Sequence, residues 1–137
     1  VKDKISTFGK SKLSRSLILL HSYLYADGKQ KELFDNDIEI EHIFPKKWQD
    51  TNYNGWLYAE AESYLERLGN KIPFEKKLNI QAGNGYFGAK KVKYSDSSVY
   101  EVQRLGKYHK NDWIKDDIEE REKSMIDRLI TFFKENL

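Results

Sequence analysis

Two long stretches of the chain carry apolar residues at intervals of three and four, which predicts helices with one buried face. The first runs from Lys10 to Tyr25, and its stripe consists of Leu13, Leu17, Leu20 and Leu24. The second runs from Trp113 to Phe133, and its stripe consists of Ile114, Ile118, Met125, Ile126, Leu129, Ile130 and Phe133. Asn111 or Asp112 is the expected N-cap of this last helix, because a short polar side chain accepts a hydrogen bond from the first turn.

Shorter patterned segments lie between these two helices. Alternation of apolar and polar residues from Asn36 to Ile43 predicts a half-buried strand, which Pro45 ends. A helical pattern follows from Leu57 to Leu68, with Gly69 as its expected C-cap. The next segments predict a short strand, a helical turn and a lysine-rich helix, at Asn70–Phe74, Glu75–Asn79 and Asn84–Tyr94. We therefore expect an α+β fold, mainly helical, with one two-stranded element in the middle.

Composition narrows the class of protein. A length of 137 residues fits a single domain over residues 1–137, and 39% hydrophobic residues suffice for a core. The absence of cysteine excludes disulfides and thiolate metal sites, which fits a cytoplasmic protein. No apolar run approaches the ~20 residues of a membrane span, and the net charge of +2 neither demands nor excludes a nucleic-acid partner. Because the chain begins at Val1 rather than Met, we expect it to be a piece of a larger protein.

The clearest chemical signal lies at the end of the first expected strand, where Glu41 and His42 stand side by side before Pro45. Hydrolysis of a phosphodiester needs an activated water and positive charge near the phosphate. Neutral histidine accepts a proton near pH 7, and a carboxylate binds a hard divalent cation. Taken alone, an adjacent Glu and His are more often an ordinary surface or core pair.

Two asparagines downstream strengthen the chemical interpretation. Asn70 follows Leu68 and Gly69, and Asn79 comes nine residues later, on the expected helical turn. An amide oxygen is a neutral ligand for a hard cation, and an amide can also brace the loop behind a catalytic base. The order of an acidic–His pair, an Asn on a second element and an Asn on a helix indicates a metal-dependent hydrolytic site.

These motifs resemble the C-terminal domain of GmrSD-type restriction proteins. The resemblance covers roughly residues 12 to 133 and rests on Glu41–Pro45, Leu68–Asn70, Asn79, Phe87–Lys91, and Trp113 with Arg121. The first of these elements is also similar to the HNH domain of the RNA-guided Cas nucleases, in which an Asp stands before the His. The resemblance implies a ββα-metal (HNH-like) finger embedded in a mainly helical domain.

The family also implies roles for individual residues. His42 would be the general base, and Asn70 would complete the catalytic set by bracing the loop and orienting that base. Glu41 and Asn79 would be the metal ligands, with Mg²⁺ or Mn²⁺ the expected ion because the ligands are oxygen atoms. Lys90 and Lys91 match a basic pair that would contact phosphate.

Lysines flank the expected site in sequence and could form a groove for the phosphate backbone. Each one taken singly is more often a solvated surface residue, but their grouping on both sides of the asparagines favours DNA. The expected nucleic-acid-binding residues are Lys46, Lys47, Lys76, Lys77, Lys90 and Lys91.

The expected function is that of a metal-dependent DNA endonuclease domain, nicking or cutting, in a modification-dependent restriction protein. The resemblance implies phage defence, a DNA substrate that can be modified phage DNA, and an N-terminal or separate nucleotide-hydrolysing sensor domain as a partner. Three alternatives stay open: a non-catalytic DNA-binding or regulatory module with an HNH-like fold, a structural helical domain that mediates subunit contacts, and an RNA substrate.

Three features of the sequence depart from a regular pair of strands or from the usual HNH motif. Glu41 and His42 should point to opposite faces of a regular strand, so both can face one phosphate only if the chain twists there. Glu41 is one methylene longer than the Asp found in related HNH domains. Pro73 should interrupt the pairing of the second strand, because proline has no backbone N–H to donate.

Overall fold

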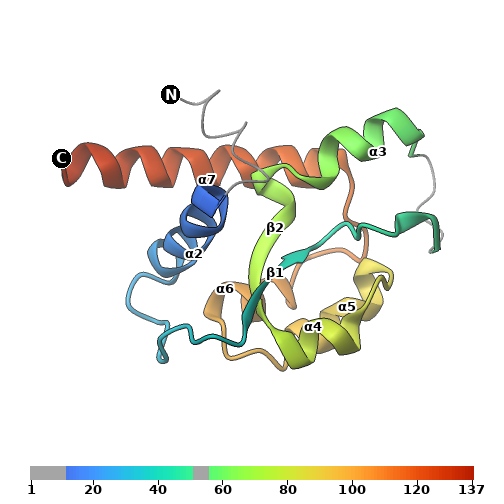
Figure 1. Cartoon of the computed structure of the whole chain (residues 1–137), viewed down its shortest axis with the longest axis horizontal. Helices are drawn as coiled ribbons and strands as arrows, with labels where there is room; N and C mark the ends of the chain where they lie inside the picture. Colours follow the sequence, from blue (N-terminus) through green and yellow to red (C-terminus); the bar gives the residue numbers. More distant parts are fainter. Residues whose placement is uncertain (1–11, 51–55) are drawn as a thin grey trace.

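The computed structural model of the chain, shown in Figure 1, describes residues 12–50 and 56–137. Lys10 and Ser11, with which the first expected helix begins, lie outside the described residues. In chain order the elements are α2 (Lys12–Ala26), β1 (Ile38–His42), the 3₁₀ turn η1 (Trp48–Asp50), α3 (Tyr58–Leu65), the 3₁₀ turn η2 (Leu68–Asn70), β2 (Lys71–Glu75), α4 (Lys76–Ala82), α5 (Phe87–Tyr94), α6 (Tyr100–Leu105) and α7 (Lys115–Glu135). This order confirms a mainly helical α+β fold.

The sheet consists of the antiparallel pair β1 and β2, which extends from Ile38 opposite Glu75 to His42 opposite Lys71. Contrary to expectation, Pro73 does not interrupt it and pairs with Ile40. Backbone hydrogen bonds from Lys76 to Asp37 and from Ile43 to Asn70 flank the ladder. Since hydrogen-bonded pairs alternate with non-bonded pairs, this register gives Pro73 a position where no N–H is required.

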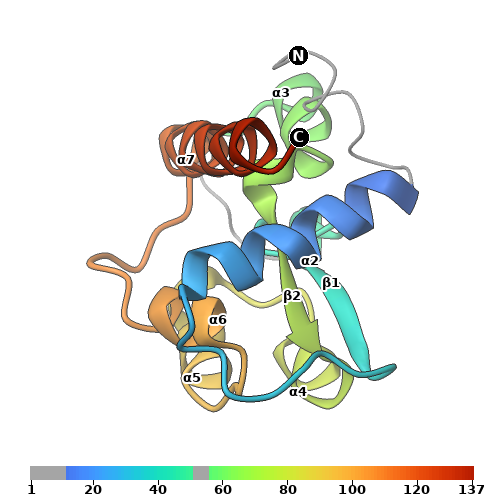
Figure 2. The same ribbon diagram turned by 90° about the vertical axis from the view of Figure 1, so that its left-hand side faces the viewer.

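Helices lie at both ends of this central sheet. In Figure 1, α7 runs along one end, while α4, α5 and α6 gather at the other; in Figure 2, α2 passes across the two strands. The larger core cluster joins the strands to α3, α5 and α6 and is rich in aromatic side chains, among them Phe44, Phe74, Phe87 and Trp113. A second cluster fills the space between α2 and α7, with Leu17, Leu68 and Leu129.

The ends of several elements differ from the sequence-based expectation. The N-cap of α7 is Ile114, not Asn111 or Asp112, and the Asp117 carboxylate accepts a hydrogen bond from the Ile114 backbone N–H at 2.9 Å. Helix α3 ends at Leu65 with Glu66 as its C-cap, so Gly69 does not cap it. The short helix α6 was not expected at all. No helix among the described residues is long and apolar enough to cross a membrane.

Gly69 has a packing role instead of a capping role. It lies in η2, where the chain presses against α7, and a Cβ at this position would overlap the Ile118 carbonyl oxygen and come within 2.7 Å of the Glu122 Cβ. The Glu122 carboxylate accepts a hydrogen bond from the Gly69 backbone N–H at 3.3 Å. The close approach fixes the position of the next residue, Asn70, relative to α7.

Candidate functional site

A polar depression of about 330 Å³ opens where the end of β1 meets α4. Its walls are Ile40, Glu41, His42, Pro45, Lys46, Asn79, Ile80, Gly83 and Asn84. Three residues expected from the sequence to carry the chemistry, Glu41, His42 and Asn79, therefore lie in one depression. Asn70 does not line it.

His42 is held by a carboxylate that the sequence did not point to. Its Nε2 lies 3.0 Å from Oε2 of Glu66, and the other oxygen of Glu66 lies 2.8 Å from Nζ of Lys71. Burial lowers the pKa of His42 to about 4, because the cost of desolvating the imidazolium exceeds the attraction of Glu66. The ring is therefore neutral near pH 7, with Nε2 directed to Glu66 and Nδ1 left as its other nitrogen.

The pair of Glu66 and Lys71 is a product of the tertiary structure. Glu66 follows the last residue of α3, and Lys71 stands opposite His42 in the sheet. Burial would raise the pKa of Glu66, but the hydrogen bonds and charges of Lys71 and His42 outweigh it and hold that pKa below its usual value. The register of the sheet could have pointed to Lys71, whereas no spacing in the sequence identifies Glu66.

Glu41 is buried, and its carboxylate is already engaged by two residues of α5. Its Oε2 accepts hydrogen bonds from Nζ of Lys90 at 2.9 Å and from the hydroxyl of Tyr94 at 2.7 Å. Burial still raises the pKa of Glu41, because the loss of hydration exceeds what Lys90 and Tyr94 return. Lys90 and Tyr94 thus offset only part of the cost of burying this carboxylate.

Lys90 is an interior residue and not a surface one. It is only 1% exposed, and besides Glu41 its ammonium donates to the backbone carbonyl oxygens of His42 and Ile43, each at 3.0 Å. Burial lowers its pKa. Lys90 therefore fixes the end of β1 from inside, which leaves it unavailable to a phosphate on the surface.

These contacts show how Glu41 and His42, which are neighbours on one strand, can both border one site. The Glu41 carboxylate points toward α5, and the His42 ring points toward Glu66 at the end of α3. Their directions diverge as the alternation of a strand requires. Both nevertheless border the same depression, because it opens at the last two residues of β1.

Asn79 reaches the depression from α4, which begins directly where β2 ends. Its side-chain nitrogen Nδ2 donates a hydrogen bond to Oε1 of Glu39 at 3.1 Å. Glu39 lies on β1, two residues before Glu41. The hydrogen bond ties the proposed ligand on the helix to the strand that carries the other one.

Asn70 is fully buried and braces the loop that follows His42. Its Oδ1 accepts a hydrogen bond from the backbone N–H of Phe44 at 2.7 Å, and its Nδ2 donates to the carbonyl oxygens of Phe44 at 2.9 Å and Leu65 at 3.1 Å. The indole N–H of Trp113 also donates to Oδ1, at 3.2 Å. Asn70 thus joins three segments behind the depression and contacts no reacting group directly.

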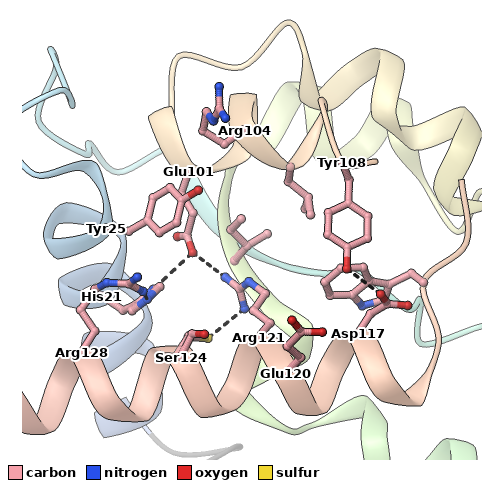
Figure 3. Close-up of a pocket in the computed structure, with 14 residues that line it drawn as sticks. His21, Tyr25, Glu101, Arg104, Tyr108, Asp117, Glu120, Arg121, Ser124 and Arg128 are labelled. Atoms are coloured by element: carbon pink, nitrogen blue, oxygen red, sulfur yellow. Dashed lines mark hydrogen bonds and ion pairs between the residues drawn. The ribbon is translucent and has the colours of Figure 1, made fainter. Parts of the chain in front are cut away.

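A second polar cluster lies on the side of α7, where Figure 3 shows His21 and Arg121 directed toward Glu101. Arg121 donates from Nη1 to the carbonyl oxygens of Gly69 at 3.2 Å and Lys71 at 2.9 Å, and from Nη2 to Glu101 at 2.7 Å. Nδ1 of His21 lies 3.2 Å from the same carboxylate. Arg121 and His21 outweigh the burial of Glu101 and lower its pKa to about 2.

The remaining expected DNA-binding lysines fall into two groups. Lys46, Lys47, Lys76 and Lys77 are exposed, and Lys46 borders the depression. Lys91 instead holds the segment before α7, donating from Nζ to the carbonyl oxygens of Tyr108 at 2.7 Å and Lys110 at 3.0 Å. Four of the six lysines thus have the exposure that contact with a phosphate backbone requires.

The donor atoms at the depression fit a hard divalent cation of low protein coordination. Within residues 12–50 and 56–137, no three or more side chains of His, Cys, Asp or Glu are grouped so as to hold a metal ion. One carboxylate and one amide, from Glu41 and Asn79, remain as candidate ligands. Mg²⁺ is commonly bound through one or two protein oxygens while it keeps several waters, which suits this set.

Comparison with known proteins assigns the family. The fold and the depression define a mainly helical α+β domain with a histidine, a carboxylate and an amide around one polar site. The family model described as GmrSD restriction endonucleases, C-terminal domain, matches residues 2–128, and the chain belongs to this family. No curated protein and no solved structure matches the chain.

Proposed function

We propose that this domain hydrolyses phosphodiester bonds of DNA with the help of one divalent cation, as the nuclease domain of a modification-dependent restriction protein. The observation that carries the proposal is the meeting of Glu41, His42 and Asn79 at one depression. Membership of the GmrSD restriction endonuclease family supports a role in restriction. In this interpretation β1, β2 and α4 are the two strands and the helix of a ββα-metal, HNH-type finger.

His42 acts as the general base. Its Nε2 is engaged with Glu66 at 3.0 Å, so Nδ1 is the nitrogen that accepts a proton from water. The imidazole is neutral near pH 7, since burial lowers its pKa to about 4, and Glu66, which acts to raise that pKa, would stabilise the imidazolium once the proton is taken. The water oxygen forms the new bond to phosphorus while the bond from phosphorus to the 3′ oxygen breaks.

Glu41 and Asn79 hold the cation in this proposal. When bound, Mg²⁺ or Mn²⁺ supplies positive charge that stabilises the phosphate and the departing 3′ oxygen. Oε1 is the oxygen of Glu41 that would serve as ligand, because Oε2 already accepts from Lys90 and Tyr94. Asn70 keeps the loop after His42 in place through its two hydrogen bonds to Phe44.

In this proposal exposed lysines contact the DNA backbone. Lys46, which borders the depression, and Lys47 follow β1, and Lys76 and Lys77 lie in the first turn of α4. Contacts to phosphate release counterions, and the affinity for DNA should fall steeply as salt is raised. Modified phage DNA as the substrate, and a nucleotide-hydrolysing sensor domain as the partner, are further parts of this proposal that rest on the family.

One observation favours a second candidate, a non-catalytic DNA-binding or regulatory module. The carboxylate of Glu41 is bound internally by Lys90, and an ion pair of this kind also occurs in purely structural positions. The two candidates differ in whether a divalent cation binds at Glu41 and Asn79.

Nicking of supercoiled plasmid tests the proposal. The wild-type domain is compared with His42→Ala in Mg²⁺, Mn²⁺ and EDTA. We expect metal-dependent nicking that His42→Ala abolishes; nicking that survives in this variant would refute His42 as the base. Thermal stabilisation by Mn²⁺ is measured in parallel and should disappear in Glu41→Ala and Asn79→Ala. DNA binding without nicking and without any effect of metal would favour the non-catalytic module.

A further inference from the structure

We propose that Glu39 is a positioning residue that sets the orientation of the Asn79 amide, so that the amide oxygen faces the cation. The inference rests on the proposed function, because it concerns the same metal site. Glu39 lies outside the Glu41–Pro45 element on which the resemblance rests, and the inference makes a statement about metal affinity that can be measured without following DNA cleavage.

The contact between the two residues is short and constrained by the fold. Nδ2 of Asn79 lies 3.1 Å from Oε1 of Glu39, and both side chains are half-buried. Helix α4 starts at Lys76 immediately after β2, and the Lys76 backbone N–H donates to the carbonyl oxygen of Asp37 at 2.8 Å. The first turn of α4 is therefore fastened to the start of β1, which keeps Glu39 and Asn79 side by side.

The chemistry of the two groups decides which end of the amide faces which way. A carboxylate only accepts hydrogen bonds, whereas an amide has one donating and one accepting end. Glu39 can therefore be satisfied only by the nitrogen of Asn79. The oxygen is turned away from Glu39, and Asn79 lines the depression that also holds Glu41 and His42.

The amide can take two orientations, and the hydrogen bond to Glu39 favours one of them. One directs the oxygen to a cation, and the other presents an N–H₂ group, which cannot ligate a metal ion. A hydrogen bond to a charged acceptor is stronger than one between neutral groups, so Glu39 selects the productive orientation before the cation arrives. Partners of this kind behind a ligand commonly change metal affinity by about 10-fold or more.

A purely electrostatic role for Glu39 makes a different prediction, and a double-mutant cycle separates the two. In the variant Asn79→Asp the ligand is a carboxylate, which presents an oxygen in either orientation and needs no selection. If Glu39 only positions the amide, replacing Glu39 in this background should not change the metal affinity. Attraction between the Glu39 charge and the cation would persist in that background.

The experiment measures Mn²⁺ affinity by titration calorimetry for Glu39→Gln in the wild-type and Asn79→Asp backgrounds. Asp37→Asn is the matched control, because it removes a charge from an exposed residue directly before the same strand. We expect Glu39→Gln to weaken Mn²⁺ binding by roughly tenfold in the wild-type background, and by no more than Asp37→Asn does in the Asn79→Asp background.

Two results would overturn the inference: equal weakening by Glu39→Gln in both backgrounds, or weakening in the wild-type background no greater than that of Asp37→Asn. Asn79→Ala distinguishes this failure from failure of the proposed function. If Asn79→Ala weakens Mn²⁺ binding and Glu39→Gln does not, only the role of Glu39 is wrong. If Asn79→Ala leaves Mn²⁺ binding unchanged, the metal site itself is wrong. Thermal unfolding without metal verifies that each variant is folded.

Discussion

Two buried carboxylates in this domain, Glu41 and Glu101, have similar exposure, but their pKa values are shifted in opposite directions. Each is 4% exposed. Glu101 lies among α2, α6 and α7, where Arg121 at 2.7 Å and His21 at 3.2 Å lower its pKa to about 2. Glu41 has Lys90 at 2.9 Å and the hydroxyl of Tyr94 at 2.7 Å, yet burial raises its pKa.

The two carboxylates therefore differ in how far their surroundings offset the cost of burial. At Glu101 the interactions with Arg121 and His21 outweigh that cost. At Glu41 the interactions with Lys90 and Tyr94 do not outweigh it, and in the proposed function a divalent ion at the depression would add positive charge there. Perturbed carboxylates of the second kind cluster at functional sites.

The largest expected effect is on stability, at Glu101. Glu101→Gln leaves Arg121 partly buried without its ionic partner, and breaking a buried pair in this way costs about 3 kcal/mol of unfolding free energy. Urea denaturation monitored by circular dichroism measures it. Glu120→Gln, an exposed change on the adjoining face of α7, is the control. A loss at Glu101→Gln no greater than that of the control would remove the contrast between the two carboxylates.

The next effect is on activity, at Glu41. Glu41→Gln keeps an acceptor for Lys90 and Tyr94 but removes the ligand charge, so we expect metal-dependent nicking to fall about 100-fold. Glu41→Gln also leaves a buried cation, Lys90, without its ionic partner, so the loss of unfolding free energy should be about 3 kcal/mol, as for Glu101→Gln. Nicking rates and urea denaturation on the same preparations check both parts. If Glu41→Gln is destabilised but fully active, Glu41 maintains the fold and does not serve the proposed site.

The pH dependence of stability should also separate the two residues. Glu101 has a lowered pKa, so its contribution is complete above pH 4.5 and is lost as the pH falls toward 2. The slope reaches at most ~1.4 kcal/mol per pH unit for one such group. Glu41 has a raised pKa and contributes in the opposite sense, since the folded state then takes up the proton more readily. The free energy of unfolding, measured by urea denaturation from the acid range to neutral pH, should depend less steeply on pH in Glu101→Gln than in the wild type.

The smallest expected effect concerns the carboxylate behind His42. Glu66→Gln retains a hydrogen-bonding group near Nε2 of His42 but removes the charge, so the ring is oriented less firmly. We expect the nicking rate to fall about tenfold with DNA affinity unchanged. Single-turnover kinetics and a DNA-binding titration separate the two quantities. Glu62→Gln, an exposed change on α3, is the control. A wild-type rate in Glu66→Gln would mean that the loop alone positions His42.

The sequence predicted the elements and motif residues better than their partners. The alternation before Pro45 identified the strand that ends at His42, and the long apolar stripe identified α7, because both patterns are local. The motifs also brought out Glu41, His42 and Asn79, which meet at one depression.

Long-range contacts account for what the sequence could not predict. The pairing of His42 with Glu66 depends on how α3 is placed against the sheet, and Lys90 became an interior cation only because α5 covers Glu41. Pro73 was misjudged for a related reason, since its place in the hydrogen-bonding alternation depends on the register with β1. Metal binding, catalysis and the DNA contacts remain predictions for the experiments above.

Gly69 has a consequence for how this domain would respond to random mutation. Its α-hydrogen faces the backbone of α7 so closely that any side chain would force η2 and the helix apart. Asn70 would move with it, and so would the loop that Asn70 holds behind His42. A survey of inactive variants would therefore recover Gly69 beside His42, although it touches no substrate. Mapping such a survey without the structure would overstate the extent of the catalytic surface.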